Sequence, residues 1–150
     1  MPEKCVLWRT VAGLGLLTMF AGCVATEQMP TGKSLYERIG GKPVISVVVE
    51  QGMANVLADT RINGRFATAD IRKLKGYLVD HLCMATGGPC TYSGRAMKTA
   101  HAGMRISTGD AGAFVEDLVK AMELAKVPAQ EKGELLDLLG SMKKDIIEAR

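Results

Sequence analysis

Apolar side chains recur at helical spacing along most of the chain. The clearest helix is expected over about residues 70–86, where Ile71, Leu74, Leu78 and Leu82 fall on one face. Two further amphipathic helices are expected near the C-terminus, from apolar positions at Phe114, Leu118, Met122, Leu135, Leu138, Leu139, Met142 and Ile146. Since no convincing strand remains, the pattern predicts an all-α fold.

Residues 44–58 combine strand-favouring side chains with helical spacing. Residues 45–49 are mostly β-branched, which favours a strand on propensity alone. The apolar positions nevertheless follow a helical stripe, formed by Ile45, Val48, Val49, Met53 and Val56. We therefore expect a helix here, with short helices at residues 34–39 and 96–103.

The first 22 residues are typical of a removable export signal. Lys4 and Arg9 give a basic start, and the apolar run over residues 11–20 is too short to span a bilayer. The run ends in Phe20-Ala21-Gly22-Cys23, which resembles a bacterial lipobox. We expect Cys23 to be lipidated, residues 23–33 to form a tether and residues 34–150 one folded domain. The alternative is an ordinary secretory signal with Cys23 incidental.

An exported lipoprotein with Val24 after its lipidated cysteine is expected at the periplasmic face of the outer membrane or the cell surface. The chain is 47% hydrophobic and carries a net charge of only +3, without a basic stripe. With 5% aromatic residues, this composition argues against nucleic-acid binding. Glu131, Glu134 and Asp145 are interpreted as a solvated helix face.

Two cysteines, Cys83 and Cys90, lie in the expected domain. They do not form a c-type haem motif, because no Cys-x-x-Cys-His occurs, and two thiols without a spaced histidine pair make a poor zinc site. Residues 87–89 (Gly-Gly-Pro) reverse the chain between them, so we expect a disulfide. The alternative is two buried thiols.

His81 and His101 are the two histidines of the chain. His101 has Met97 four residues before it and Met104 three residues after it, which places it on an apolar helical face. A lone histidine in such a place is more often part of the core than a ligand. A haem ligand needs the same apolar surroundings, however, with a hydrogen bond to orient the ring.

Several short motifs between residues 35 and 148 bear on this choice. They are Leu35-Tyr-Glu-Arg-Ile-Gly-Gly41, Val56-Leu-Ala-Asp-Thr-Arg-Ile62, Phe66, Gly87-Gly88, Tyr92-Ser-Gly-Arg-Ala-Met97, Ala100-His101 and Val127-Pro128. In this order and spacing they resemble the group I truncated haemoglobins over nearly the whole domain. The resemblance implies a two-over-two helical sandwich that holds b-type haem non-covalently.

The resemblance also implies roles for individual residues. His101 corresponds to the proximal iron ligand, and Phe66 to the phenylalanine that stacks on the porphyrin. Met97, Met104 and Leu78 are expected to pack around the haem. His81 matches an aromatic position on the haem and is expected in the pocket wall, with a sixth-ligand role as the alternative.

The distal side departs from the family pattern. Met53 replaces the usual tyrosine, and Leu74 replaces a polar residue that often faces the gas ligand. Leu78 adds another apolar group one turn further. Tyr77 could donate a hydrogen bond or, when deprotonated, bind ferric iron; alternatively its ring lies across a haem edge with the hydroxyl in water.

These features support a haem-binding globin that binds, senses or detoxifies a diatomic gas (O2, NO or CO). The first alternative is an enzyme such as a nitric-oxide dioxygenase or peroxidase, which would need a redox partner. Met53 and Leu74 argue against turnover of nitric oxide, since that reaction needs tightly held oxygen. The second alternative is a haem-free structural lipoprotein, against which the presence of His101 counts.

Overall fold

The computed structural model describes residues 32–149, which form helices joined by turns. The elements are α1 (Leu35–Ile39), α2 (Gly41–Ala58), the 3₁₀ helix η1 (Asn63–Phe66), α3 (Ile71–Ala85), α4 (Met97–His101), α5 (Thr108–Leu124) and α6 (Ala129–Ile146). Within these residues the β-structure consists of one isolated bridge, between Ser107 and Ala149. The predicted all-α fold is confirmed.

Local geometry fixes both ends of α1. The Ser34 hydroxyl accepts a hydrogen bond from the Glu37 amide at 3.3 Å, and the Glu37 carboxylate accepts one from the Ser34 amide at 2.8 Å. Gly40 ends the helix with a φ of +107°, and a Cβ there would meet Cγ2 of Val44 at 2.7 Å. Glycine is therefore required where α1 turns into α2.

Helix α2 forms despite its β-branched side chains because its apolar stripe is buried. The five stripe positions are at most 3% exposed: Ile45, Val48, Val49, Met53 and Val56. Helix α2 packs against both α3 and α5, so these side chains lie at the centre of the core. Tertiary burial thus overrides the strand propensity of residues 45–49.

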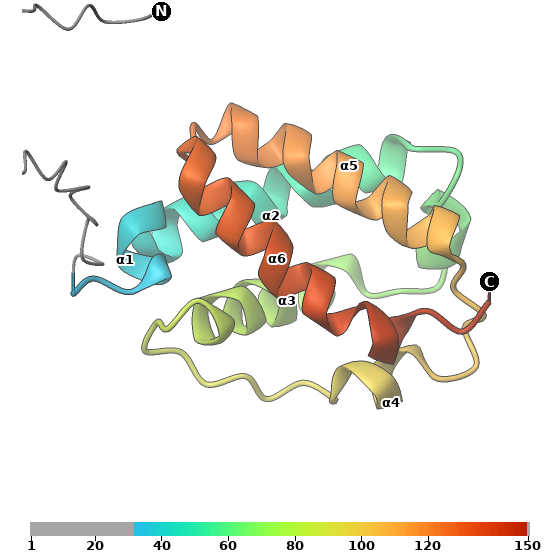
Figure 1. Ribbon diagram of the computed structural model, residues 1–150. Helices are drawn as coiled ribbons and strands as arrows, with labels where there is room; N and C mark the ends of the chain where they lie inside the picture. Colours follow the sequence, from blue (N-terminus) through green and yellow to red (C-terminus); the bar gives the residue numbers. More distant parts are fainter. Residues whose placement is uncertain (1–31, 150) are drawn as a thin grey trace, which may run out of the picture.

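The helices pack in two layers, with α2 and α3 in one and α5 and α6 in the other (Figure 1). This is the predicted two-over-two arrangement. Helix α6 crosses the molecule and ends against the short helix α4 (Figure 1). The loop between α3 and α4 runs along one edge and brings α4 back toward α6.

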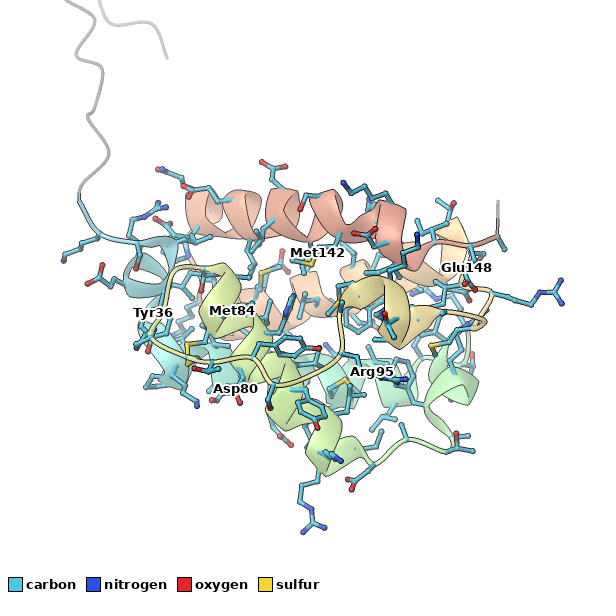
Figure 2. All side chains as sticks on the ribbon, turned by 90° about the horizontal axis from the view of Figure 1, so that it is seen from below. Tyr36, Asp80, Met84, Arg95, Met142 and Glu148 are labelled. Atoms are coloured by element: carbon cyan, nitrogen blue, oxygen red, sulfur yellow. A yellow bond between two sulfur atoms is a disulfide. The ribbon has the colours of Figure 1, made fainter. Side chains whose placement is uncertain are left out.

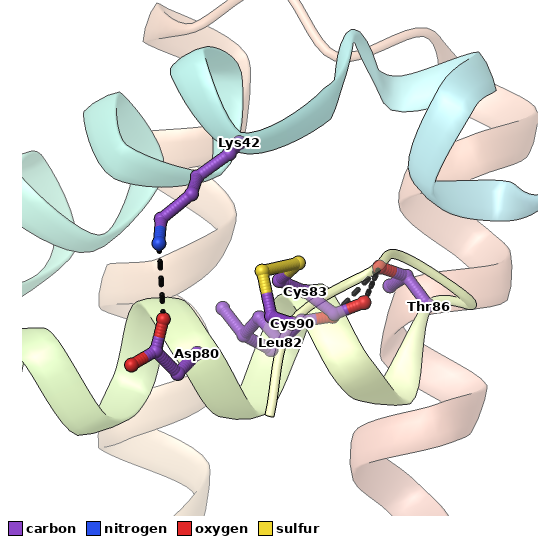
Figure 3. The surroundings of a disulfide bond; sticks show 6 residues. All are labelled: Lys42, Asp80, Leu82, Cys83, Thr86 and Cys90. Carbon is purple, nitrogen blue, oxygen red and sulfur yellow. Dashed lines mark hydrogen bonds and ion pairs between the residues drawn. A yellow bond between two sulfur atoms is a disulfide. The ribbon is translucent and has the colours of Figure 1, made fainter. Parts of the chain in front are cut away.

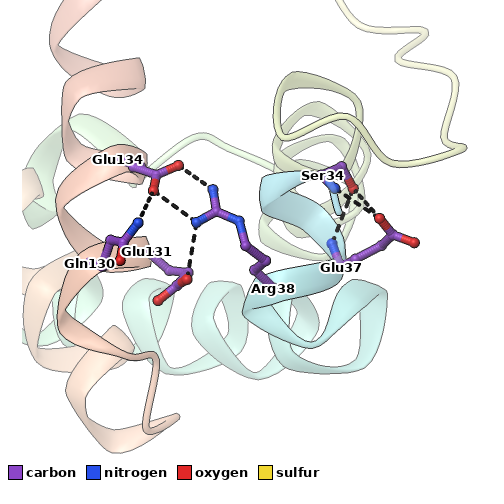
Figure 4. Close-up of polar contacts among 6 residues, drawn as sticks. All are labelled: Ser34, Glu37, Arg38, Gln130, Glu131 and Glu134. Atoms are coloured by element: carbon purple, nitrogen blue, oxygen red, sulfur yellow. Dashed lines mark hydrogen bonds and ion pairs between the residues drawn. The ribbon is translucent and has the colours of Figure 1, made fainter. Parts of the chain in front are cut away.

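A charged cluster joins α1 to α6 (Figure 4). Arg38 forms an ion pair with Glu131 at 3.1 Å and a two-pronged pair with Glu134. The Arg38 and Glu131 side chains are only 21% and 12% exposed. The interpretation as a solvated face is therefore wrong for Glu131, whereas the Glu134 side chain remains 38% exposed while it pairs with the same arginine.

A disulfide joins Cys83, in the last turn of α3, to Cys90 in the loop that leads to α4 (Figure 3). Their Cα atoms are 5.7 Å apart. The Gly88 amide donates to the Cys83 carbonyl at 2.8 Å, and the Thr86 hydroxyl donates to the Leu82 carbonyl at 2.6 Å. These bonds end α3 and turn the chain back beneath it.

The expected signal (residues 1–22), the lipidated Cys23 and nearly all of the tether (23–33) lie outside the described residues. Among residues 32–149, no helix has both the length and the apolar character needed to cross a membrane.

Candidate functional site

A cavity of about 720 Å³ lies between the helical layers. Its volume is in the range of about 300–1,000 Å³ typical of pockets for cofactors and other small molecules. Apolar side chains form most of its wall, including Val49 of α2, Leu118 of α5 and Leu139 of α6. The exposed side chains of Lys73 and Arg95 lie on its rim. The cavity thus suits a large, mainly apolar molecule with a negatively charged edge.

The structure brings the candidate cofactor and distal residues of the sequence to this one cavity. They line it from α2, η1, α3, α4 and the turn after α4, and are Met53, Phe66, Leu74, Tyr77, Leu78, His81, Met97, His101 and Met104. Met53 is 2% exposed, whereas Met104 is 39% exposed. Met104 therefore contacts the cavity from its outer edge.

His101 is oriented by its own helix. Its Nδ1 lies 2.8 Å from the carbonyl oxygen of Met97, one turn earlier. A carbonyl can only accept, so Nδ1 carries the proton and donates. In the neutral ring Nε2 then keeps its lone pair, which is the state of a histidine that binds a metal.

The wall formed by α2 and α3 offers mainly apolar atoms to the cavity. Met53 is buried, and Leu74 and Leu78 are partly buried against the same core. Tyr77 lies between Leu74 and Leu78 along α3, with Nζ of Lys73 5.8 Å from its ring centroid. The side-chain hydrogen-bond donors that this wall offers to the cavity are Lys73, Tyr77 and His81, all of them on α3.

His81 is held between α3, α6 and the loop before α4. Its Nε2 lies 3.4 Å from Sδ of Met142, which points from α6 toward α3 (Figure 2), and its ring packs edge-on against Tyr92 with centroids 4.8 Å apart. Nδ1 is buried without a hydrogen-bond partner in the described part of the chain. Burial lowers the pKa of His81, which favours its neutral form.

Tyr92 is a site residue that the sequence reasoning did not single out. Its hydroxyl donates to the Arg95 carbonyl at 2.8 Å, so the ring folds over Gly94, where a Cβ would overlap it. The ring lines the cavity and contacts both His81 and Tyr77. Its position in the Tyr-x-Gly-Arg motif was the available signal, since glycine two residues after an aromatic permits this close approach.

Residues 32–149 contain no group of three or more His, Cys, Asp or Glu side chains able to hold a metal ion. His101 and His81 both line the cavity, and the ring of His101 is oriented by its hydrogen bond to the Met97 carbonyl. The cavity, its apolar walls and the oriented imidazole together fit a flat metal-containing macrocycle.

The comparisons with known proteins agree with this geometry. The profile of the bacterial-like globin family matches residues 34–148. The group 1 truncated haemoglobin GlbN of Mycolicibacterium paratuberculosis is 35% identical over 113 residues, or 75% of this chain and 83% of that protein. GlbN of Nostoc commune is 32% identical over 76% of this chain and 97% of its own length.

Solved structures show the same fold. The truncated haemoglobin of Tetrahymena pyriformis in its Fe(III) form superposes with a TM-score of 0.74 at 28% identity, covering 77% of this chain and 98% of that one. The 2/2 haemoglobin of a Synechococcus species, described with covalently attached haem, gives a TM-score of 0.72 at 29% identity and the same coverage. The chain therefore belongs to the bacterial-like globin family and, within it, to the group 1 truncated haemoglobins.

Proposed function

We propose that this globin holds b-type haem non-covalently in the 720 Å³ cavity and binds a diatomic gas there. The observation that carries the proposal is the orientation of His101 on the cavity wall. Its Nδ1–H donates a hydrogen bond to the Met97 carbonyl, so Nε2 keeps its lone pair in the neutral ring. Phe66, Met97 and Leu78 supply apolar contacts for the porphyrin. Lys73 and Arg95 on the rim suit the negatively charged propionates.

The residues facing the gas decide how long it is held. Haem iron, when bound, supplies the atom at which the gas binds. Met53, Leu74 and Leu78 provide no hydrogen-bond donor, so a ligand that gains negative charge on binding is weakly stabilised. Oxygen should therefore leave about one to two decades faster than from relatives with a tyrosine–glutamine pair, corresponding to roughly 1.5–3 kcal/mol for one strong hydrogen bond.

The proximal assignment is tested by His101→Ala, with His81→Ala as the matched control. Protein purified from cells should show the intense near-ultraviolet haem band, and His101→Ala should lose it unless imidazole is added. His81→Ala should reduce haem retention less. An unchanged spectrum in His101→Ala would refute the assignment. Extraction into acidified organic solvent should remove all haem, whereas retained haem would show a covalent link.

The distal assignment is tested by a gain of function. Met53→Tyr places a phenol at the buried position on α2, and the oxygen dissociation rate should fall about tenfold or more. Tyr77→Phe removes the phenol donor that α3 offers to the cavity. A slow dissociation rate in the parent protein that neither variant changes would contradict an apolar distal pocket.

We also infer that the protein is exported and anchored by lipid at Cys23, where the tether would hold the globin close to a membrane surface. Besides the signal-like sequence, the Cys83–Cys90 disulfide supports this, because such bonds persist mainly in oxidising compartments. Labelled palmitate should be incorporated in cells by the parent protein and not by Cys23→Ala. Equal labelling would refute the anchor.

A further inference from the structure

The C-terminal end of the chain holds the turn that follows α4. Glu148 lies beside this turn (Figure 2). Its Oε1 accepts a hydrogen bond from the Gly103 amide at 2.8 Å, and its Oε2 accepts one from the Arg105 amide at 2.7 Å. Both carboxylate oxygens thus accept hydrogen bonds from backbone amides of the same turn. Charge-assisted bonds of this kind are stronger than neutral ones.

Further bonds fix the same turn from two sides. The amides of Glu148 and Ala149 both donate to the Ile106 carbonyl, at 2.9 and 3.1 Å. From η1, the Arg65 guanidinium donates to the Met104 carbonyl at 2.8 Å. Residues 102–106 are therefore held between η1 and the end of the chain.

His101 depends on this turn because α4 cannot hold itself in place. The helix has five residues and no side-chain N-cap, and helices of that length are unstable alone. The Met104 amide donates to the His101 carbonyl at 3.1 Å. Met104 lies between Gly103 and Arg105, whose amides Glu148 binds, so any displacement of the turn is transmitted to His101.

We propose that Glu148 is a positioning residue for His101: its carboxylate fixes the turn, and the turn fixes the height and tilt of the imidazole on the proximal side. This rests on the proposed function, in which His101 is the iron ligand. The two amide hydrogen bonds also lower the pKa of the Glu148 carboxyl group below its ordinary value.

The test compares Glu148→Ala and Glu148→Gln with Glu123→Ala as the control. Glutamine has one acceptor oxygen and can serve one amide, whereas alanine serves neither. Glu123 is another exposed glutamate, paired with Lys132 on the surface of α5 and α6. We expect the haem dissociation rate to rise about three- to tenfold in Glu148→Ala, less in Glu148→Gln and not in the control.

Two measurements separate positioning from a general loss of stability. In the ferrous, gas-free protein, the iron–histidine stretching frequency in resonance Raman spectra should shift in Glu148→Ala and partly recover in Glu148→Gln. In the haem-free protein, hydrogen exchange of the Gly103 and Arg105 amides should accelerate while the core of α2 stays protected. Parent-like frequency and exchange in Glu148→Ala would overturn the proposal. A parent protein without haem would instead refute the proposed function.

Discussion

Removing the Cys83–Cys90 bridge should destabilise the haem-free protein and loosen its pocket. The bridge ties the end of α3, which carries Leu74 and Leu78, to the loop that carries Tyr92 (Figure 3). Without it, α3 and this loop can separate at the edge of the cavity. The perturbation is the double variant Cys83→Ser/Cys90→Ser, compared with the oxidised parent and with the parent after reduction.

The magnitude follows from the length of the closed loop. The two cysteines are separated by seven positions. For so short a loop, the chain-entropy model gives a stabilisation of about 2.5 kcal/mol through restriction of the unfolded chain. In a domain of this size, such a loss lowers the melting temperature by about 10 °C. Cys83 is fully buried, so a serine there adds the cost of a buried hydroxyl.

Urea unfolding of the haem-free protein, followed by circular dichroism, measures the loss. Reduction alone should lower the free energy of unfolding by about 2.5 kcal/mol, and the double variant should lose at least as much. Reducing agent should have no effect on the double variant, which serves as the control. Haem transfer to an acceptor globin should be faster after reduction. If reduced and oxidised parent proteins unfold at the same urea concentration, the bridge does not stabilise the fold.

Three further predictions concern local interactions. Hydrogen bonds from the side chain and the amide of Ser107 lower the pKa of Asp110 from 3.8 to about 2. The stabilisation from the charged carboxylate is therefore complete above about pH 4 and is lost as pH falls toward 2. In Asp110→Asn, the free energy of unfolding should depend less on pH in that window. Gly76→Ala, in open space on α3, should stabilise the protein by about 0.5–1 kcal/mol. Gly94→Ala should instead cost about 1–2 kcal/mol, because the new methyl group displaces Tyr92 from its hydrogen bond and ring contact. Thermal melts of both glycine variants measure these shifts, and equal melting temperatures would contradict the reasoning.

The helices could be predicted because apolar periodicity reports directly on burial. On α2 the spacing outweighed the β-branched composition, since all five stripe positions face the core. Glycine and proline marked the ends of α1 and α3 and the start of α6 to within a residue or two. These signals depend only on residues close together in the chain, so they can be recognised in the sequence without knowledge of the fold.

Long-range polar contacts leave no comparable signal. Arg38 and its two glutamates on α6 look like surface charges until the fold brings them together. Asp117 on α5 is 2% exposed, although its residue type predicts a surface position. Glu148 follows the last helix, and it lies beside the turn after His101 because α6 ends next to that turn in the fold. Periodicity places a residue on a face but does not identify its partner there.

The Arg38 cluster has a consequence for the order in which the domain can fold. Arg38 and Glu134 are 96 positions apart, and the first helix completes its contacts only when the last one is present (Figure 4). Contacts of such high sequence separation close late and slow the search for the native state. A nascent chain that still lacks α6 cannot form the contact between Arg38 and Glu134. We therefore expect the ion pairs that join Arg38 to Glu131 and Glu134 to form only after α6 has been synthesised.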